Sequence, residues 1–109
     1  MSASIEFKKY LMDKLTNPEQ ARQYLDIALA DYQIDGDMGG FLLALRDIAE
    51  AQGGIGQLSA RTKLNRQHLY RSISGQGNPR LSTLSAILEA CGLRLSVTPL
   101  DDANTPKQA

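Results

Sequence analysis

The side chains in this sequence that could carry out chemistry are few. There is one cysteine, Cys91, and one histidine, His68. A lone cysteine cannot form an internal disulfide, and a single Cys and a single His cannot supply the ligands of a zinc site. No nucleophile, base and orienting group can be assembled from the sequence. We therefore expect neither an enzyme nor a bound cofactor.

Charge is the second chemical signal, because it is distributed unevenly. The net charge of the 109 residues is zero, yet residues 1–50 carry five Lys or Arg and nine Asp or Glu. Residues 51–88 carry five cations and no acid: Arg61, Lys63, Arg66, Arg71 and Arg80. An acid-free basic segment suits a polyanion such as nucleic acid. Chance clustering on a solvated face is the alternative.

Length and hydropathy limit the class of protein. A chain of 109 residues is expected to form one small domain with one core. No apolar run reaches the roughly 20 residues that span a bilayer, so we expect no membrane segment. The first residues lack a basic start and an apolar secretory segment. We expect a cytoplasmic protein.

Apolar spacing and capping residues predict a nearly all-helical chain. Asn17 is placed to cap a helix, with Pro18 at its first position and Gln20 completing a capping box. Gly36 ends that helix, and Asp37 caps the next one, which stops at Gly53-Gly54. The predicted helices are a less regular one over 5–15, then 18–33, one from 38 to Gly53-Gly54, 57–62 and 66–74.

The end of the chain combines a loop, a helix and one strand. Residues 75–79 have loop composition, and Ser82 is predicted to cap a last helix that carries Cys91 on its apolar face and closes at Gly92. Leu93–Thr98 then alternate strictly, which predicts a half-buried strand with Leu93, Leu95 and Val97 facing the core. Residues 101–109 are predicted to be a flexible tail. The expected fold class is an all-α bundle with one short C-terminal β-strand.

Residues 57–73 have the pattern of a helix-turn-helix. Leu58, Leu64, Leu69 and Ile73 are spaced to face inward, and Asn65 is placed to cap the second helix. This leaves four side chains on the outward face of the second helix, which enters the major groove in this motif: Arg66, Gln67, Tyr70 and Arg71. An Arg side chain can hydrogen-bond to the edge of guanine, and a Gln side chain to the edge of adenine. Gln57 is expected to anchor the first helix to phosphate. A plain helical hairpin is the alternative.

Several neighbouring features have two interpretations. His68 is either a phosphate contact or an ordinary surface histidine, and Tyr70 either touches DNA or shields the 75–79 loop. Residues 53–56 look like a phosphate-binding loop, but helix punctuation explains them better, because no strand precedes them. Asp31, Asp35 and Asp37 are interpreted as a solvated helix end rather than a metal site.

The chain resembles the Cro/lambda-repressor-like helix-turn-helix family from about Gly39 to Val97. Within that family it is most similar to the addiction-module antidote branch. The resemblance implies an antitoxin that binds operator DNA as a dimer, represses its own operon and neutralises a RelE-like toxin. A stand-alone transcription regulator without a toxin is the alternative. Lys63 occupies the turn position usually held by Gly. The runs that carry the resemblance are Phe41–Gly54, Leu64–Arg71, Gly77–Pro79 and Gly92–Leu95.

The expected partners follow from the resemblance together with the charge pattern. RelE-like toxins act on ribosome-bound RNA, so the resemblance implies a basic toxin that the acidic N-terminal half would complement. Glu19, Asp26 and Asp31 are then the candidate toxin-binding residues, although they could simply confer solubility. We expect a helical extension over 1–37, a DNA-binding domain over 38–100 and a tail over 101–109.

The predicted strand also suggests how two copies meet. An unpaired strand leaves backbone groups without partners, and this chain offers no second convincing strand. Antiparallel pairing of Leu93–Thr98 with the same segment of a second copy would form a two-fold homodimer. Pairing with Ile5–Phe7 of its own chain is the alternative.

Overall fold

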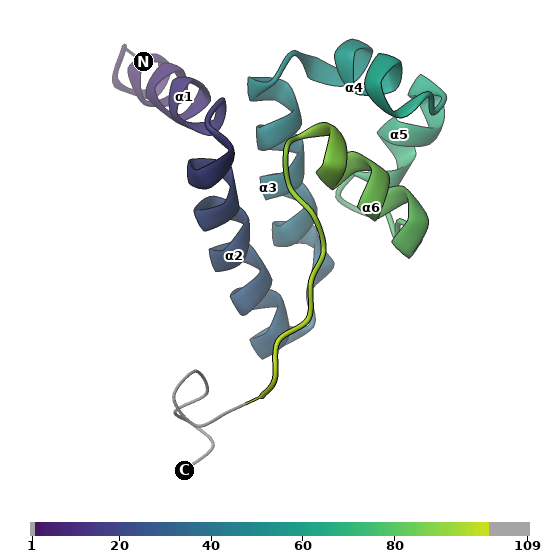
Figure 1. Ribbon diagram of the computed structural model, residues 1–109. Helices are drawn as coiled ribbons and strands as arrows, with labels where there is room; N and C mark the ends of the chain where they lie inside the picture. Colours follow the sequence, from purple (N-terminus) through teal and green to yellow (C-terminus); the bar gives the residue numbers. More distant parts are fainter. Residues whose placement is uncertain (1, 101–109) are drawn as a thin grey trace.

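The computed structural model describes residues 2–100, and this part of the chain consists of six α-helices joined by short connections (Figure 1). Helices α2 and α3 lie side by side as an antiparallel pair, α1 packs across one end of them, and α4, α5 and α6 form the other side of the molecule. The helices are α1 Ser2–Leu15, α2 Pro18–Asp35, α3 Met38–Ala51, α4 Gly54–Thr62, α5 Arg66–Ser72 and α6 Leu81–Ala90.

The predicted cap at the start of α2 is confirmed. Asn17 has an extended backbone, and its Oδ1 accepts hydrogen bonds from the N–H groups of Glu19 (2.8 Å) and Gln20 (3.2 Å). The capping box is incomplete, because the Asn17 N–H donates to the carbonyl of Lys14 at the end of α1 (3.2 Å) rather than to Gln20. The close succession of α1 and α2 therefore replaces half of the box.

Helix α3 supplies more of the buried core than any other helix. Gly36 ends α2 in the left-handed region, and Asp37 caps α3 by accepting from the Gly39 N–H (2.9 Å). From α2, Tyr24 Oη donates to Asp47 Oδ2 of α3 (2.7 Å), which ties the pair together through a half-buried contact. The buried side chains of α3 are Phe41, Leu42, Ala44, Leu45, Ile48 and Ala49.

The helices share one core, and a single glutamine links three of their ends. Leu15, Ala21 and Leu25 from α1 and α2 belong to the same buried cluster as the apolar residues of α4, α5 and α6. After α3, Gln52 Nε2 donates to the carbonyls of Leu15 (3.4 Å) and Cys91 (3.3 Å). This contact satisfies carbonyls that a helix end leaves unpaired.

At α6 the sequence located the end of the helix but not its start. Gly92 is left-handed, and the Leu93 N–H returns to the carbonyl of Leu88 (2.8 Å), as expected for a C-terminal glycine. Cys91 is buried, as predicted, and burial raises the pKa of its thiol. The Ser82 cap is wrong: α6 begins at Leu81, and Arg80 is the capping position without a side-chain hydrogen bond.

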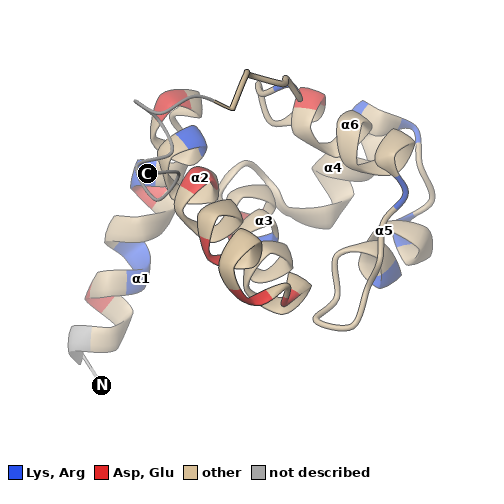
Figure 2. Cartoon of the chain, turned by 90° about the horizontal axis from the view of Figure 1, so that it is seen from below, with Lys and Arg blue, Asp and Glu red and all other residues tan. Residues whose placement is uncertain are grey.

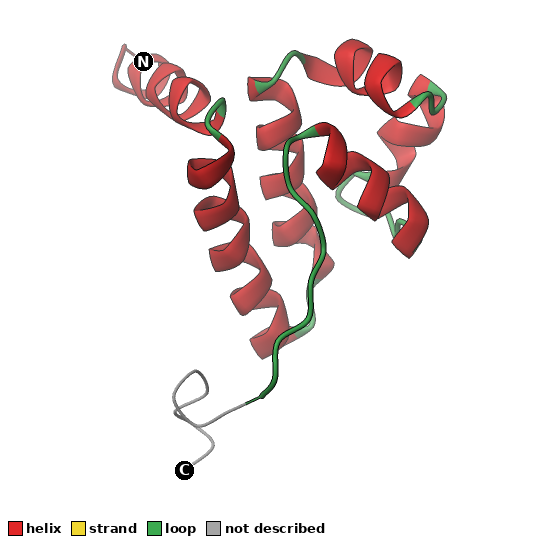
Figure 3. Ribbon diagram, viewed as in Figure 1, coloured by secondary structure: helices red, strands yellow, loops and turns green. Residues whose placement is uncertain are grey.

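The predicted C-terminal strand is also wrong, since residues 2–100 include no β-strand (Figure 3). Leu93 is half-buried, but Leu95 is 43% exposed and Val97 is 95% exposed, so the alternating side chains do not cover the core. Alternation favours an extended backbone, whereas a strand needs a neighbouring strand to bond with. Ile5–Phe7, the one intrachain candidate, lies within α1. The tail over 101–109 lies outside the described residues.

Candidate nucleic-acid interface

A turn of three residues joins α4 to α5, and side chains of α4 hold it in place. Ser59 Oγ donates to the carbonyl of Leu64 (2.6 Å), and Thr62 Oγ1 accepts from the Leu64 N–H (3.2 Å). Thr62 Oγ1 also donates back to the carbonyl of Leu58 (2.7 Å). These bonds satisfy the polar groups of the turn and fix the direction in which α5 leaves it.

Lys63 is the residue that makes the turn. Its backbone lies in the left-handed region, with φ at 63°, and it is the one non-glycine residue with positive φ in the described part of the chain. The Lys63 N–H donates to the carbonyl of Ser59 (2.8 Å). The turn therefore keeps the conformation that favours glycine, and the fold absorbs a strain of about 1–2 kcal/mol.

Apolar side chains hold the helix pair against the core, as the sequence predicted. Leu58, Leu69 and Ile73 are buried, and Leu64 is half-buried against them. Asn65 caps α5, with its Oδ1 accepting from the N–H groups of Gln67 (2.7 Å) and His68 (3.1 Å). The side-chain oxygen of Asn65 is thus engaged in the fold.

The outward side of α5 is polar and exposed. Gln67 and Arg71 are four residues apart, so they share one helix face directed away from the buried Leu69. Tyr70 is 64% exposed, and Arg66 and Gln57 are exposed as well. The structure therefore presents the predicted reading side chains to solvent on one rigid element.

His68 points elsewhere. Its ring Nε2 lies 3.5 Å from Thr83 Oγ1 of α6, a buried hydroxyl. The distance is at the limit of a hydrogen bond. This contact directs the ring toward α6 and away from the face that carries Gln67 and Arg71.

The α4–α6 side of the molecule carries cations and a single carboxylate, Glu89, whereas carboxylates outnumber cations over α2 and α3 (Figure 2). Arg61 Nη1 donates to the carbonyl of Ala90 at the end of α6 (3.2 Å), so this guanidinium is engaged within the fold. None of the ion pairs among the described residues involves Lys63, Arg66, Arg71 or Arg80. From the sequence, the five cations of the acid-free segment are expected as a group to meet phosphates, but Lys63 and Arg80 are not among the individually named DNA-binding residues.

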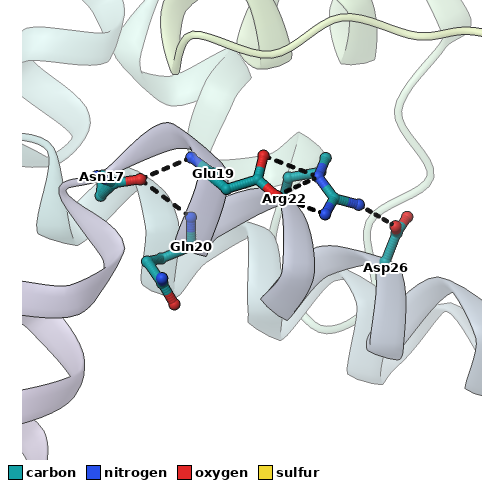
Figure 4. Close-up of polar contacts among 5 residues, drawn as sticks. All are labelled: Asn17, Glu19, Gln20, Arg22 and Asp26. Atoms are coloured by element: carbon teal, nitrogen blue, oxygen red, sulfur yellow. Dashed lines mark hydrogen bonds and ion pairs between the residues drawn. The ribbon is translucent and has the colours of Figure 1, made fainter.

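The three candidate toxin-binding carboxylates of α2 differ in their surroundings. The guanidinium of Arg22 pairs with Glu19 (Nη2 to Oε2, 2.6 Å) and with Asp26 (Nη1 to Oδ2, 2.9 Å), as Figure 4 shows. The Arg22 hydrogen bond lowers the pKa of Glu19, and Glu19 raises the pKa of Arg22. Asp31 takes no part in this chain of contacts and is exposed. Arg22 lies three residues after Glu19 and four before Asp26, and this spacing on a helix could have indicated both ion pairs from the sequence.

The acids at the α2–α3 junction serve the backbone. Asp35 Oδ1 accepts from the Asp37 N–H (2.9 Å), and Asp37 itself caps α3. Within residues 2–100, no three His, Cys, Asp or Glu residues are grouped so that they could hold a metal ion. Among the described helices, none is both long and apolar enough to cross a bilayer.

Comparison with known proteins gives one family and one relative. Residues 6–99 match the family described as "Probable addiction module antidote protein". A protein of Haemophilus influenzae (strain ATCC 51907 / DSM 11121 / KW20 / Rd), described as uncharacterized, is 32% identical over 85 residues, which cover 78% of this chain and 82% of the relative. No solved structure matches the chain.

Proposed function

Because the chain belongs to the family of probable addiction module antidote proteins, we propose that it is the antitoxin of a type II toxin–antitoxin module. It binds operator DNA as a dimer, represses its own operon and neutralises a RelE-like toxin. The observation that carries this proposal is the exposed polar face of α5 within the acid-free segment 51–88. In this proposal the two regions bind different partners according to their charge: residues 1–37 contact the toxin and residues 38–100 contact the DNA.

In this proposal α4 and α5 act as a helix-turn-helix, with α5 in the major groove. Gln67 and Arg71 read base edges, because their amide and guanidinium groups match adenine and guanine. Arg66 and Tyr70 border the same face, and Gln57 at the start of α4 contacts phosphate. Asn65 contributes by capping α5, and His68 lies at the edge of the interface beside α6.

Salt dependence tests the DNA contact. Four of the five cations in residues 51–88 have neither an ion pair nor a carbonyl partner: Lys63, Arg66, Arg71 and Arg80. Because Arg71 is assigned to a base edge, the other three would give a dimer six phosphate contacts. Each contact contributes about −0.9, so the slope of log K against log salt should be near −5 on duplex DNA from upstream of the gene. A binding constant indifferent to salt would remove the proposal.

Two glutamines form a matched test of base reading. Gln67→Ala should weaken operator binding by about 1–3 kcal/mol and relax specificity at one base pair, while binding to random duplex stays nearly unchanged. Gln57→Ala, which removes a proposed phosphate contact, should weaken both duplexes alike. An equal loss of binding to operator and to random duplex in Gln67→Ala would show that Gln67 does not read a base.

The proposed toxin surface is the acidic side of α2. Removing residues 1–37 is unsuitable as a test, because Leu15, Ala21 and Leu25 are part of the core. Asp31→Lys reverses an exposed charge instead and should weaken copurification with the product of the neighbouring reading frame. Glu89→Lys on α6 makes the same change outside the acidic half and should leave it intact. If no toxin copurifies with the unaltered protein, a stand-alone transcription regulator is the better description.

The proposed homodimer uses the extended segment after α6. Leu93–Thr98 form one wall of a groove of about 860 Å³ whose other side includes Leu25, Leu29 and Phe41. Apart from the Leu93 N–H, the backbone of 93–100 has no hydrogen-bond partner among the described residues. Antiparallel pairing of two copies about Ser96 would give alternate ones of these groups a partner and place Arg94 opposite Thr98, which avoids like charges.

Ser96→Pro removes one amide from the proposed pairing, whereas Ser96→Ala keeps it. Sedimentation should show monomers for Ser96→Pro at concentrations where the parent and Ser96→Ala are dimers. An unchanged dimer in Ser96→Pro would place the interface on the helices.

A further inference from the structure

The three glycines at the start of α4 have different reasons to be there. Gly53 and Gly54 have φ of 117° and 84°, a region that side chains rarely adopt, so they act as the helix punctuation expected from the sequence. Gly56 has no positive φ and lies inside α4, where glycine is a poorer helix former than alanine. Backbone conformation therefore does not explain Gly56.

The side chain of Arg66 accounts for this glycine. A Cβ placed on Gly56 would lie 3.0 Å from Nη2 and 3.7 Å from Cζ of Arg66. The first side chain of α5 thus runs back across the turn and rests its guanidinium on the first turns of α4. The recess at Gly56 is the space that the guanidinium occupies.

The charge surroundings of Arg66 indicate what this position is for. No ion pair within residues 2–100 includes Arg66, and residues 51–88 contain no carboxylate. The guanidinium lies near the N-terminal end of α4, where the helix dipole is positive. In the free protein, the positive end of the helix dipole repels the guanidinium at this place. A bound anion would offset this repulsion.

We infer that Gly56 is a positioning residue, which holds Arg66 against α4 so that its guanidinium contacts a DNA phosphate rather than a base. This inference rests on the proposed DNA binding and revises one of its details. Base reading then falls to Gln67 and Arg71, whose shared face points away from the core. Arg66 instead sets the register of the helix pair on the duplex, since phosphate contacts position and base contacts specify.

The test places a side chain in the recess at Gly56 and compares the result with the same substitution at a glycine that has no neighbouring side chain. Gly56→Leu should displace Arg66, while Gly40→Leu on α3 changes a glycine whose Cβ would meet nothing within 4 Å. Both variants add a good helix former, so each should melt at or above the temperature of the parent. Binding is measured on operator and on random duplex over a range of salt concentrations.

Loss of one phosphate contact per protomer should make the slope for a Gly56→Leu dimer less steep by about 1.8. Since the electrostatic contribution vanishes near 1 M salt, this corresponds to a loss on the order of 10–100-fold at 0.1 M, equal on both duplexes. Gly40→Leu should bind like the parent. In an Arg66→Ala background, Gly56→Leu should cause no further loss, which excludes a direct clash of the leucine with DNA.

The contrary results are distinct. A loss on operator alone in Arg66→Ala would make Arg66 a base reader and overturn the inference, as would an unchanged slope in Gly56→Leu. Both of these results leave the proposed function standing, because the parent still binds with a steep slope. A parent protein without salt-dependent binding would instead overturn the proposed function together with this inference.

Discussion

Lys63→Gly is expected to stabilise the protein. The Lys63 backbone is left-handed, with φ at 63°, and it links α4 to α5. In that region the Cβ of an L-residue crowds the following carbonyl, which glycine avoids. The side chain is exposed, so its removal leaves no cavity.

The magnitude is a difference between two effects. Relief of the left-handed conformation contributes about 1–2 kcal/mol. Glycine also gives the unfolded chain more freedom, which offsets roughly 0.5–1 kcal/mol of this gain. The net gain in the free energy of unfolding should be about 0.5–1 kcal/mol, a rise of roughly 2–8 °C in Tm for a domain of about 100 residues.

Thermal and urea unfolding, followed by circular dichroism, measure this gain, with Lys63→Ala as the matched control. Alanine removes the same charge but keeps the Cβ, so the strain should remain and stability should stay close to that of the parent. If Lys63→Gly is no more stable than Lys63→Ala, the turn is not strained and the reasoning is refuted. Both variants should also make the salt slope of the dimer less steep by about 1.8 if Lys63 contacts phosphate.

Three further outcomes follow from single contacts. Tyr24→Phe removes the hydrogen bond to Asp47 and should cost about 1 kcal/mol in urea unfolding at neutral pH. Burial, reinforced by Asp47, raises the pKa of Tyr24 to about 12, so its contribution is complete below about pH 10 and lost as the pH rises toward 12. A parent whose stability falls no faster than that of Tyr24→Phe over this range would contradict the assignment. Gly77→Ala should cost about 1–3 kcal/mol, because a Cβ there would overlap the carbonyl oxygen of Ser72, whereas Gly75→Ala, with nothing within 4 Å, should be neutral.

Local signals in the sequence located most helix ends correctly. Asn17, Asp37 and Asn65 cap helices as predicted, and Gly36 and Gly92 end them in the left-handed region. These predictions succeed because a cap joins groups within a few residues of each other, so neighbours in sequence suffice to define it.

Two predictions failed, one on the start of a helix and one on a strand. Ser82 has the right side chain for a cap, yet α6 begins one residue before it. The alternation of Leu93–Thr98 describes a backbone shape, while a strand also depends on a neighbour that residues 2–100 do not supply. Local pattern therefore predicts conformation better than it predicts pairing.

The candidate site divides in the same way. The outward face of α5 could be predicted from spacing, because Leu69 and Ile73 fix which side is inward. The sequence could not predict that Arg61 donates to the carbonyl of Ala90 or that His68 approaches Thr83, since each contact joins residues far apart in sequence. Only the folded chain separates the cations that remain available from the one that is already used.

The segregation of charge also bears on how the two proposed partners would share the protein. The acids of α2 and α3 lie away from α5, so a basic toxin and a DNA duplex would approach different sides (Figure 2). In the proposed complex, DNA would repel the acidic side and attract the basic side, which would orient the protein with α5 toward the groove before contact. A neutral chain can thus bind a polyanion in one orientation, because the asymmetry of its charge, rather than its sum, determines the encounter. Simultaneous binding of toxin and operator is the arrangement that this geometry favours.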